Sequence, residues 1–350
     1  MSAESSISPD VRHAPNAALE PAAGAPVQRS DVQRFLRTGL IFVLIGLLLY
    51  AGLYAAAERL VYQNTVRNRF FTVKTAPLGQ YDNVILGASH AYAMDYEDMT
   101  ARLAEMTDSS VLNLSAEGAG ITVNRVFLDY YLMRSQTVLD YLLTRHRTKN
   151  VIYIIDSFAF YSPEWNEDRL KDTRVYNRAP FDLRLVWLML RQPATRPIFL
   201  DYLFGFAKIN NADRFTTDIT DEEATRFDRT YRPSQQIDQS RIRYLYPVEV
   251  DQGLFDRYMG QLEALMRDLQ KRGIKLIVIK PPIPQRMYEM IPWEEQFDSR
   301  LTALLDHYGV EFHDFSLVMD EERFYFNSDH LNRTGVLHFF ENYLKPVMVE

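Results

Sequence analysis

One segment near the N-terminus limits what this chain can fold into more than any other. Residues 39–57, GLIFVLIGLLLYAGLYAAA, contain no charged side chain. A helix needs about 20 predominantly apolar residues to cross the core of a bilayer, and this run lacks the polar face that a helix of a soluble domain would show. It is also longer than the apolar region of a cleavable signal peptide, which has roughly 7–15 residues. We therefore predict one transmembrane helix within residues 35–58.

The segments on either side of this helix have different compositions. Residues 1–34 are rich in Ala, Pro and Ser and offer little to bury, which is typical of a disordered tail. We assign residues 59–80 to a juxtamembrane linker and residues 81–350 to a folded domain. The positive-inside rule does not decide the orientation, because basic residues lie on both sides of the helix: Arg29, Arg34 and Arg37 before it, and Arg59, Arg67, Arg69 and Lys74 after it.

Five short apolar runs alternate with helical stretches in the folded domain. Near-continuous apolar runs are typical of strands that are buried on both faces of a parallel sheet, with helices packed on either side. We predict a flavodoxin-like three-layer α/β sandwich of about five parallel strands, with a helical insertion at about residues 161–250. The predicted strands are residues 83–87, 111–115, 151–156, 275–280 and 310–315.

Composition excludes several classes of function. A net charge of −7 argues against a protein that grips nucleic acid, which needs clustered basic residues. The chain has no cysteine, so it has no disulfide, no zinc-thiolate site and no thiol nucleophile. Its seven histidines show no metal-ligand spacing, and no glycine-rich nucleotide loop is present. We therefore expect no metal, no cofactor and no nucleic-acid partner.

Reactive side chains follow several of the predicted strands. Ligands of open α/β sheets bind at the carboxyl ends of the strands, so residues at these ends are candidates for a site. Ser89 and His90 follow the first run, Gly118 the second, and His330 lies in a polar turn before a helix that begins near Arg333. Ser89 is either a nucleophile or a residue that caps the next helix, since serine is common at both places.

Three blocks, LGASHA, NLSAEGAG and DHLNRTG, occur in the chain in this order, each at a strand end or helix start. Together they resemble the SGNH (GDSL-type) hydrolase superfamily, in which a serine follows strand one, a glycine follows strand two and a D-x-x-H motif precedes the last helix. The resemblance implies that Ser89 is the nucleophile and His330 the general base. It also implies that the backbone N–H groups of Ser89 and Gly118 hold the oxyanion.

Two positions depart from that pattern. The acid of the D-x-x-H motif is replaced by Asn327, while Asp329 directly precedes the histidine. Either residue is a candidate to orient His330, although only a carboxylate also supplies a counter-charge. After the third strand, Asp156 occupies the place where the superfamily usually offers an asparagine to the oxyanion. We treat it, with His90 and Lys280, as a candidate on the substrate side.

Membrane-tethered relatives with similar first and last blocks place or remove O-acyl groups on cell-surface polysaccharides, often beside a membrane-bound O-acyltransferase. The resemblance therefore implies an O-acyltransferase or acyl esterase that works through an acyl-serine intermediate. It implies a bacterial inner-membrane protein with its catalytic domain in the periplasm. The alternative is a catalytically inactive SGNH-like domain that binds glycan or the acyltransferase partner, which Asn327 and Asp156 favour.

Overall fold

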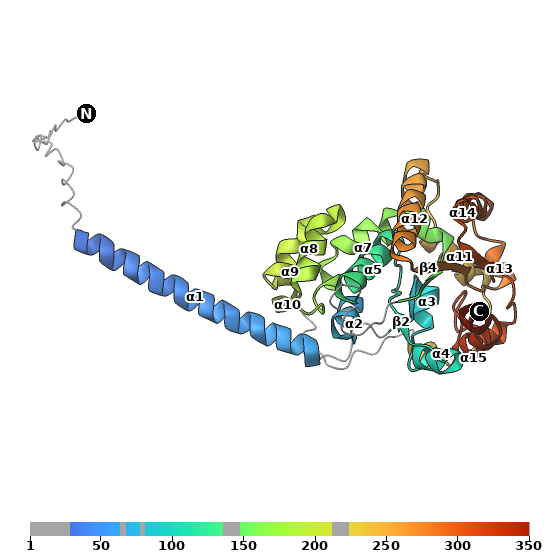
Figure 1. Ribbon diagram of the computed structural model, residues 1–350, viewed down its shortest axis with the longest axis horizontal. Coiled ribbons are helices and arrows are strands. Elements are labelled where there is room, and N and C mark those ends of the chain that lie inside the picture. The colour runs from blue at the N-terminus through green and yellow to red at the C-terminus, as the bar shows by residue number, and fades with distance from the viewer. Residues whose placement is uncertain (1–28, 64–67, 78–80, 136–147, 212–223, 350) are drawn as a thin grey trace, which may run out of the picture. The chain divides into compact units, whose positions relative to one another are not determined.

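The computed structural model describes residues 29–63, 68–77, 81–135, 148–211 and 224–349 (Figure 1). The chain divides into two compact units, residues 1–52 and residues 53–350. The predicted tail lies outside the described residues as far as Gln28, and residues 29–34 begin the first helix.

Helix α1, Arg29–Gln63, contains the apolar run and extends beyond the predicted limits at both ends. Within the part of the chain that the structure describes, it is the one helix that is long and apolar enough to cross a membrane. Its apolar side chains are largely exposed, with Phe42 at 77% and Leu48 at 73%. This exposure suits a helix whose surroundings are lipid, because a helix that is apolar all round needs an apolar environment.

The second unit is built on a five-stranded parallel sheet, as the sequence predicts. The strands follow one another in space in the order β2-β1-β3-β4-β5, with bounds β1 Asn83–Gly87, β2 Val111–Asn113, β3 Asn150–Ile154, β4 Lys275–Lys280 and β5 Glu311–Asp314. The winding direction reverses between β1 and β3. In open α/β sheets such a reversal creates a crevice at the carboxyl ends of the two strands.

Helices cover both faces of the sheet, which gives the predicted three layers. Val151 and Tyr153 of β3 point into one core and Ile152 and Ile154 into the other, as the alternation of side chains along a strand requires. The first core is covered by α5 (Ile121–Ser135), α12 (Gln252–Arg272) and α14 (Glu294–Tyr308). The second is covered by α3 (Ser89–Ala93), α4 (Met99–Thr107), α15 (Arg333–Phe339), the π-helical turn η7 (Phe340–Leu344) and α16 (Lys345–Val349).

The connection from β3 to β4 is the predicted helical insertion, and its described residues contain no strand. It packs into the first core through Trp165 and Tyr176, which are 2% and 1% exposed. Its elements are η1 (Ser157–Phe160), η2 (Pro163–Trp165), α7 (Glu167–Lys171), η3 (Thr173–Val175), α8 (Leu183–Arg191), η4 (Pro193–Ile198), α9 (Phe199–Leu203), α10 (Phe206–Ile209), η5 (Ala224–Arg226) and α11 (Gln235–Leu245). Two further short elements follow β4: α13 (Gln285–Tyr288) and η6 (Glu322–Phe324).

Part of the segment assigned to a linker is folded. Residues Arg69–Thr75 form helix α2, and the Asn68 side chain accepts a hydrogen bond from the backbone N–H of Phe71 at its start. Phe70 is fully buried and lies 5.0 Å from the ring of Phe127 in α5 and 5.2 Å from that of Tyr176 in the insertion. Helix α2 therefore belongs to the core of the domain.

Candidate active site

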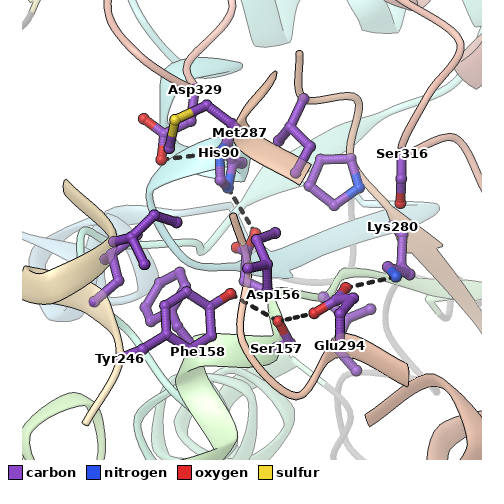
Figure 2. A pocket seen from close by; sticks show the side chains of 16 residues that line it. His90, Asp156, Ser157, Phe158, Tyr246, Lys280, Met287, Glu294, Ser316 and Asp329 are labelled. Atoms are coloured by element: carbon purple, nitrogen blue, oxygen red, sulfur yellow. Dashed lines mark hydrogen bonds and ion pairs between the residues drawn. The ribbon is translucent and has the colours of Figure 1, made fainter. Parts of the chain in front are cut away.

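A narrow pocket of about 40 Å³ lies at the carboxyl ends of β3 and β4, beside the start of α3 (Figure 2). His90, Asp156, Lys280 and Asp329 line it, so the structure brings these four sequence candidates together. They come from four separate stretches of the chain, which meet because parallel strands end at the same edge of the sheet. Ser89 directly precedes His90.

Ser89 is the first residue of α3, directly after the turn that ends β1. Gly87 is required in this turn because a Cβ atom there would lie 2.7 Å from the carbonyl oxygen of Ile154 and 2.6 Å from the Cβ of Ala91. Ala88 occupies the N-cap position, and no side-chain hydrogen bond caps the helix. The serine therefore does not serve as an N-cap. It is 9% exposed.

His330 is held through its Nδ1 atom. This atom lies 2.9 Å from Asn327 Nδ2, 3.0 Å from Asn327 Oδ1 and 3.1 Å from Asp329 Oδ1. The opposite nitrogen, Nε2, is buried and has no hydrogen-bond partner. In the tautomer that carries its proton on Nδ1, facing the oxygens of Asn327 and Asp329, the Nε2 lone pair is free to accept a proton. Burial lowers the pKa of His330, and the Asp329 carboxylate offsets this only in part. The imidazole is therefore neutral near pH 7.

Asn327 and Asp329, the two candidates to orient His330, differ in their contacts. Asn327 Oδ1 accepts the backbone N–H groups of Asp329 at 3.1 Å and His330 at 2.8 Å, so it fixes the turn. Asp329 supplies the charge. Burial alone would raise its pKa, but Arg241, whose Nε lies 3.1 Å from Asp329 Oδ2, and the two histidines hold it well below the usual range.

Sequence reasoning missed Arg241, because it lies on α11 of the insertion and no motif marks it.

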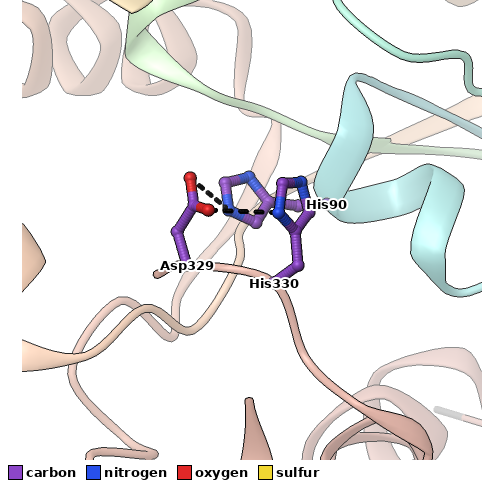
Figure 3. A group of neighbouring side chains, drawn as sticks. All are labelled: His90, Asp329 and His330. Atoms are coloured by element: carbon purple, nitrogen blue, oxygen red, sulfur yellow. Dashed lines mark ion pairs between the residues drawn. The ribbon is translucent and has the colours of Figure 1, made fainter. Parts of the chain in front are cut away.

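A second histidine lies against the first. The rings of His90 and His330 stack with centroids 4.7 Å apart and planes at 28° (Figure 3). His90 Nδ1 is 2.6 Å from Asp156 Oδ1, and His90 Nε2 is 3.7 Å from Asp329 Oδ2. Burial lowers the pKa of His90, but the carboxylates of Asp156 and Asp329 outweigh burial and raise it. Asp156 Oδ1 is therefore paired with the His90 imidazole.

Buried polar atoms without a hydrogen-bond partner gather at this site. They include His90 Nε2, Asp156 Oδ2, Asp329 Oδ1 and His330 Nε2. Such atoms are rare in proteins because each costs desolvation energy, so their clustering makes this place a candidate functional site. Ligand atoms of His90, Asp329 and His330 lie within 4.8 Å of one another, as at a metal site. The Arg241 guanidinium beside Asp329 and the cationic tendency of His90 both oppose a metal ion here.

Lys280 is engaged in a buried ion-pair network at the far side of the pocket. Its Nζ lies 2.6 Å from both Glu294 Oε1 and Asp298 Oδ1. Glu294 also accepts a hydrogen bond from Ser157, whose hydroxyl lies 2.8 Å from that of Tyr246 (Figure 2). Burial lowers the pKa of Lys280, but the two carboxylates outweigh it and raise the pKa. Lys280 is thus a permanent cation that holds the pocket wall together.

Gly118 lies in the loop after β2, with a φ of 57° that favours glycine. A Cβ atom there would lie 2.8 Å from the ring of Trp165. Both observations account for a glycine at this position through packing. Its role as an amide donor to the oxyanion stays a prediction.

No protein-family model and no curated protein matches this chain. Among solved structures, the chain is similar to a Bacteroides fragilis protein named "putative acylhydrolase", with a TM-score of 0.37 and 10% sequence identity over 80% of this chain and 94% of the other. Similarity of this degree carries no argument about activity, so the function has to be argued from the residues of the site.

Proposed function

We propose that this protein is a membrane-anchored serine-dependent O-acyltransferase or acyl esterase. The observation that carries the proposal is the surroundings of His330: its Nδ1 lies 3.0 Å from Asn327 Oδ1 and 3.1 Å from Asp329 Oδ1, burial lowers its pKa, and its Nε2 has no hydrogen-bond partner. Ser89 begins the helix on which the stacked His90 lies. A neutral imidazole oriented by a carboxylate can activate a serine hydroxyl for attack on an ester, and the proposal assigns this hydroxyl to Ser89.

The proposed reaction has two halves. Ser89 Oγ attacks the ester carbonyl as its proton passes to His330 Nε2, and Asp329 stabilises the resulting imidazolium. The tetrahedral intermediate then expels the alcohol, which takes the proton from His330, and the acyl group remains on Ser89. In the second half a hydroxyl group of an acceptor loses its proton to His330 and attacks the acyl-serine. The second tetrahedral intermediate then breaks its bond to Ser89 Oγ, which takes the proton back from His330, and the new ester or acid leaves. A sugar hydroxyl as acceptor gives transfer, whereas water gives hydrolysis. The backbone N–H groups of Ser89 and Gly118 are the proposed oxyanion donors.

The proposed setting is the periplasmic face of a bacterial inner membrane, with a cell-surface polysaccharide as the acyl acceptor or substrate and a membrane-bound O-acyltransferase as a partner. Two observations support it: helix α1, which among the described residues is the one helix long and apolar enough to cross a membrane, and the resemblance of the three sequence blocks to membrane-tethered SGNH proteins.

The second candidate is a catalytically inactive domain that binds glycan or the acyltransferase. One observation favours it: His330 Nε2 has no hydrogen-bond partner, so Ser89 Oγ and the proposed base are not hydrogen-bonded. Catalytic hydrogen bonds are often long without substrate and tighten in the reacting complex. Chemical reactivity of Ser89 separates the two candidates.

The test is capture of the acyl-enzyme. We expect a fluorophosphonate, and an aryl acetate under rapid acid quench, to modify Ser89 in wild type, as located by peptide mass spectrometry. Ser89→Ala should lose the modification, whereas Ser135→Ala, which removes a buried serine hydroxyl of α5, should keep it. Adding an oligosaccharide acceptor and analysing it for new esters distinguishes transfer from hydrolysis. A wild-type protein that stays unmodified would support the binding domain.

The protonation of His330 sets the expected pH dependence. A general base works in its deprotonated form, and the pKa of this histidine is lowered from 6.5, so kcat/KM should stay high below pH 6.5 and fall only at lower pH. The measurement is kcat/KM for an aryl ester between pH 4 and 9. His90→Asn removes a neighbouring positive charge and should move the fall toward higher pH. A wild-type profile that falls above pH 6.5 contradicts the assignment of His330 as base.

A further inference from the structure

Helix α8 of the insertion carries apolar side chains on its exposed side as well as on its buried side. One face is buried in the domain through Leu185, Val186, Leu188 and Met189. The other face exposes Leu183 at 70%, Trp187 at 55% and Leu190 at 38%. Their spacing of four and three residues places them on one side of the helix. A helix of a soluble domain normally presents polar side chains on this outer face. On α8 the outer face combines these three apolar side chains with the exposed Arg184 and Arg191.

The neighbouring helices α9 and α10 extend this surface. Leu200, Phe204 and Phe206 are 47%, 47% and 42% exposed, and the two phenylalanine rings lie 5.9 Å apart. Figure 1 shows α8, α9 and α10 gathered at one end of the domain, away from α14 and α15. Outside α1, half of the large exposed apolar side chains of the described residues fall within residues 183–206. We refer to Leu183, Trp187, Leu190, Leu200, Phe204 and Phe206 as the α8–α10 surface.

The charges beside this surface are mainly positive. Arg184, Arg191 and Arg196 are exposed, and the Arg191 guanidinium lies 5.8 Å from the centre of the Trp187 ring. Asp201 is the one acidic residue within residues 183–209. Trp, Phe and Leu flanked by arginine are typical of helices that lie in the headgroup region of a membrane with anionic lipids.

The same helices are fixed to the end of the membrane helix. Residues 53–63 of α1 belong to the same compact unit as the insertion. The Lys208 side chain of α10 is 1% exposed and pairs with Glu58, which also accepts the backbone N–H of Phe181 at 2.7 Å. Tyr54 packs edge-on against Phe181 at 6.3 Å, and at Gly205 a Cβ atom would collide with the Tyr54 ring.

This attachment places the surface at the bilayer boundary. The uncharged run ends at Ala57, so Tyr54 and Glu58 lie within about one helical turn of the point where the chain leaves the apolar core, and one turn is ~5.4 Å. Residues 205–208, which touch them, must lie at a similar depth. This argument uses contacts within the second unit alone. It rests on α1 being a membrane span and is independent of the proposed acyl chemistry.

We propose that the α8–α10 surface binds the bilayer that α1 crosses, with its apolar side chains among the upper acyl chains and its arginines at anionic lipid headgroups. The domain then has two attachments to the membrane, the span and this surface. We assign lipid as the partner of this surface because Phe206 of the surface lies next to Gly205 and close to Lys208, the residues that contact the end of the span.

The absence of cysteine makes a site-directed test direct. Single spin labels are placed on the full-length protein at Trp187→Cys, Leu190→Cys and Phe204→Cys, and the protein is inserted into nanodiscs that contain phosphatidylglycerol. Control labels are Val248→Cys, at a residue 95% exposed, and Leu47→Cys in the middle of the apolar run. Two paramagnetic reagents that collide with the label report its surroundings: molecular oxygen, which concentrates in lipid, and a nickel chelate, which stays in water. We expect labels on the surface to collide with oxygen several-fold more, relative to nickel, than the Val248 label.

Each other outcome overturns the proposal. Surface labels that match the Val248 label place the surface in water. Labels shielded from both reagents, with spin–spin broadening, identify a second copy of the chain as the occupant. A Leu47 label that is open to nickel refutes the span on which the proposal rests. The labelled positions are exposed, so unchanged far-UV circular dichroism is expected and checks the fold. The double substitution Arg184→Gln and Arg191→Gln should raise the collision rate of the nickel chelate with the label at position 187 several-fold. Arg243→Gln, which changes an exposed arginine elsewhere, should leave this rate unchanged.

Discussion

Ser89→Ala is expected to lower kcat for ester cleavage by about 10⁶-fold, the loss typical when a catalytic serine is removed from a complete serine-histidine-acid site. Without the hydroxyl, the reaction cannot pass through the acyl-serine, and His330 has no proton to accept. The measurement is steady-state cleavage of an aryl acetate, together with the ester content of polysaccharide in cells that carry the variant.

The matched control is Ser135→Ala, which removes another buried serine hydroxyl at a distance from the sheet edge. It should retain wild-type kcat. Circular dichroism and thermal unfolding of both variants exclude a folding defect as the cause. Ser89→Ala activity within tenfold of wild type would remove Ser89 from the mechanism.

Asp329→Asn is expected to lower kcat by about 10⁴-fold, as for the orienting acid of other serine-histidine sites. The carboxylate lies 3.1 Å from His330 Nδ1 and opposes part of the loss of basicity caused by burial. Its removal should therefore also lower the pKa of His330 further. The fall of kcat/KM at acid pH then moves to lower pH, a change that a purely structural role would not produce.

Asn327 provides the comparison for this variant. Asn327→Asp keeps the oxygen that accepts the backbone N–H groups of Asp329 and His330, and should keep most of the activity. Asn327→Asp should not rescue Asp329→Asn fully, because Arg241 pairs with the carboxylate at position 329. Equal losses of kcat in Asp329→Asn and Asn327→Ala, with no shift in the pH profile, would assign both residues to the turn alone.

The sheet was predictable because each strand carries its own signal. The run from Lys275 to Lys280 is apolar between its two lysines, and β4 has these same bounds. Helix α2 was missed because it is short, and its partners Phe127 and Tyr176 are far along the chain. No local pattern shows that Phe70 is fully buried.

The site was predictable where residues follow strands. Ser89, Asp156 and Lys280 could be placed at one edge because parallel strands end there. The pairing of His90 with Asp156 could not be predicted, since it depends on the direction of α3 after Gly87. Arg241 lies on the insertion, whose path over the sheet has no sequence signature. The positive charge that holds Asp329 ionised was therefore invisible from the sequence.

The buried contact between Glu58 and Lys208 bears on how the domain can be released from its anchor. The apolar run ends at Ala57, which suggests a soluble fragment that starts just after it. Cleavage beyond Glu58 would leave the ammonium of Lys208, 1% exposed, without its carboxylate. Leaving a buried charge unpaired typically costs about 3–5 kcal/mol. A proteolytic cut on the C-terminal side of Glu58 would thus destabilise the released domain. A stable fragment has to keep Glu58 and the rest of helix α1 that follows it.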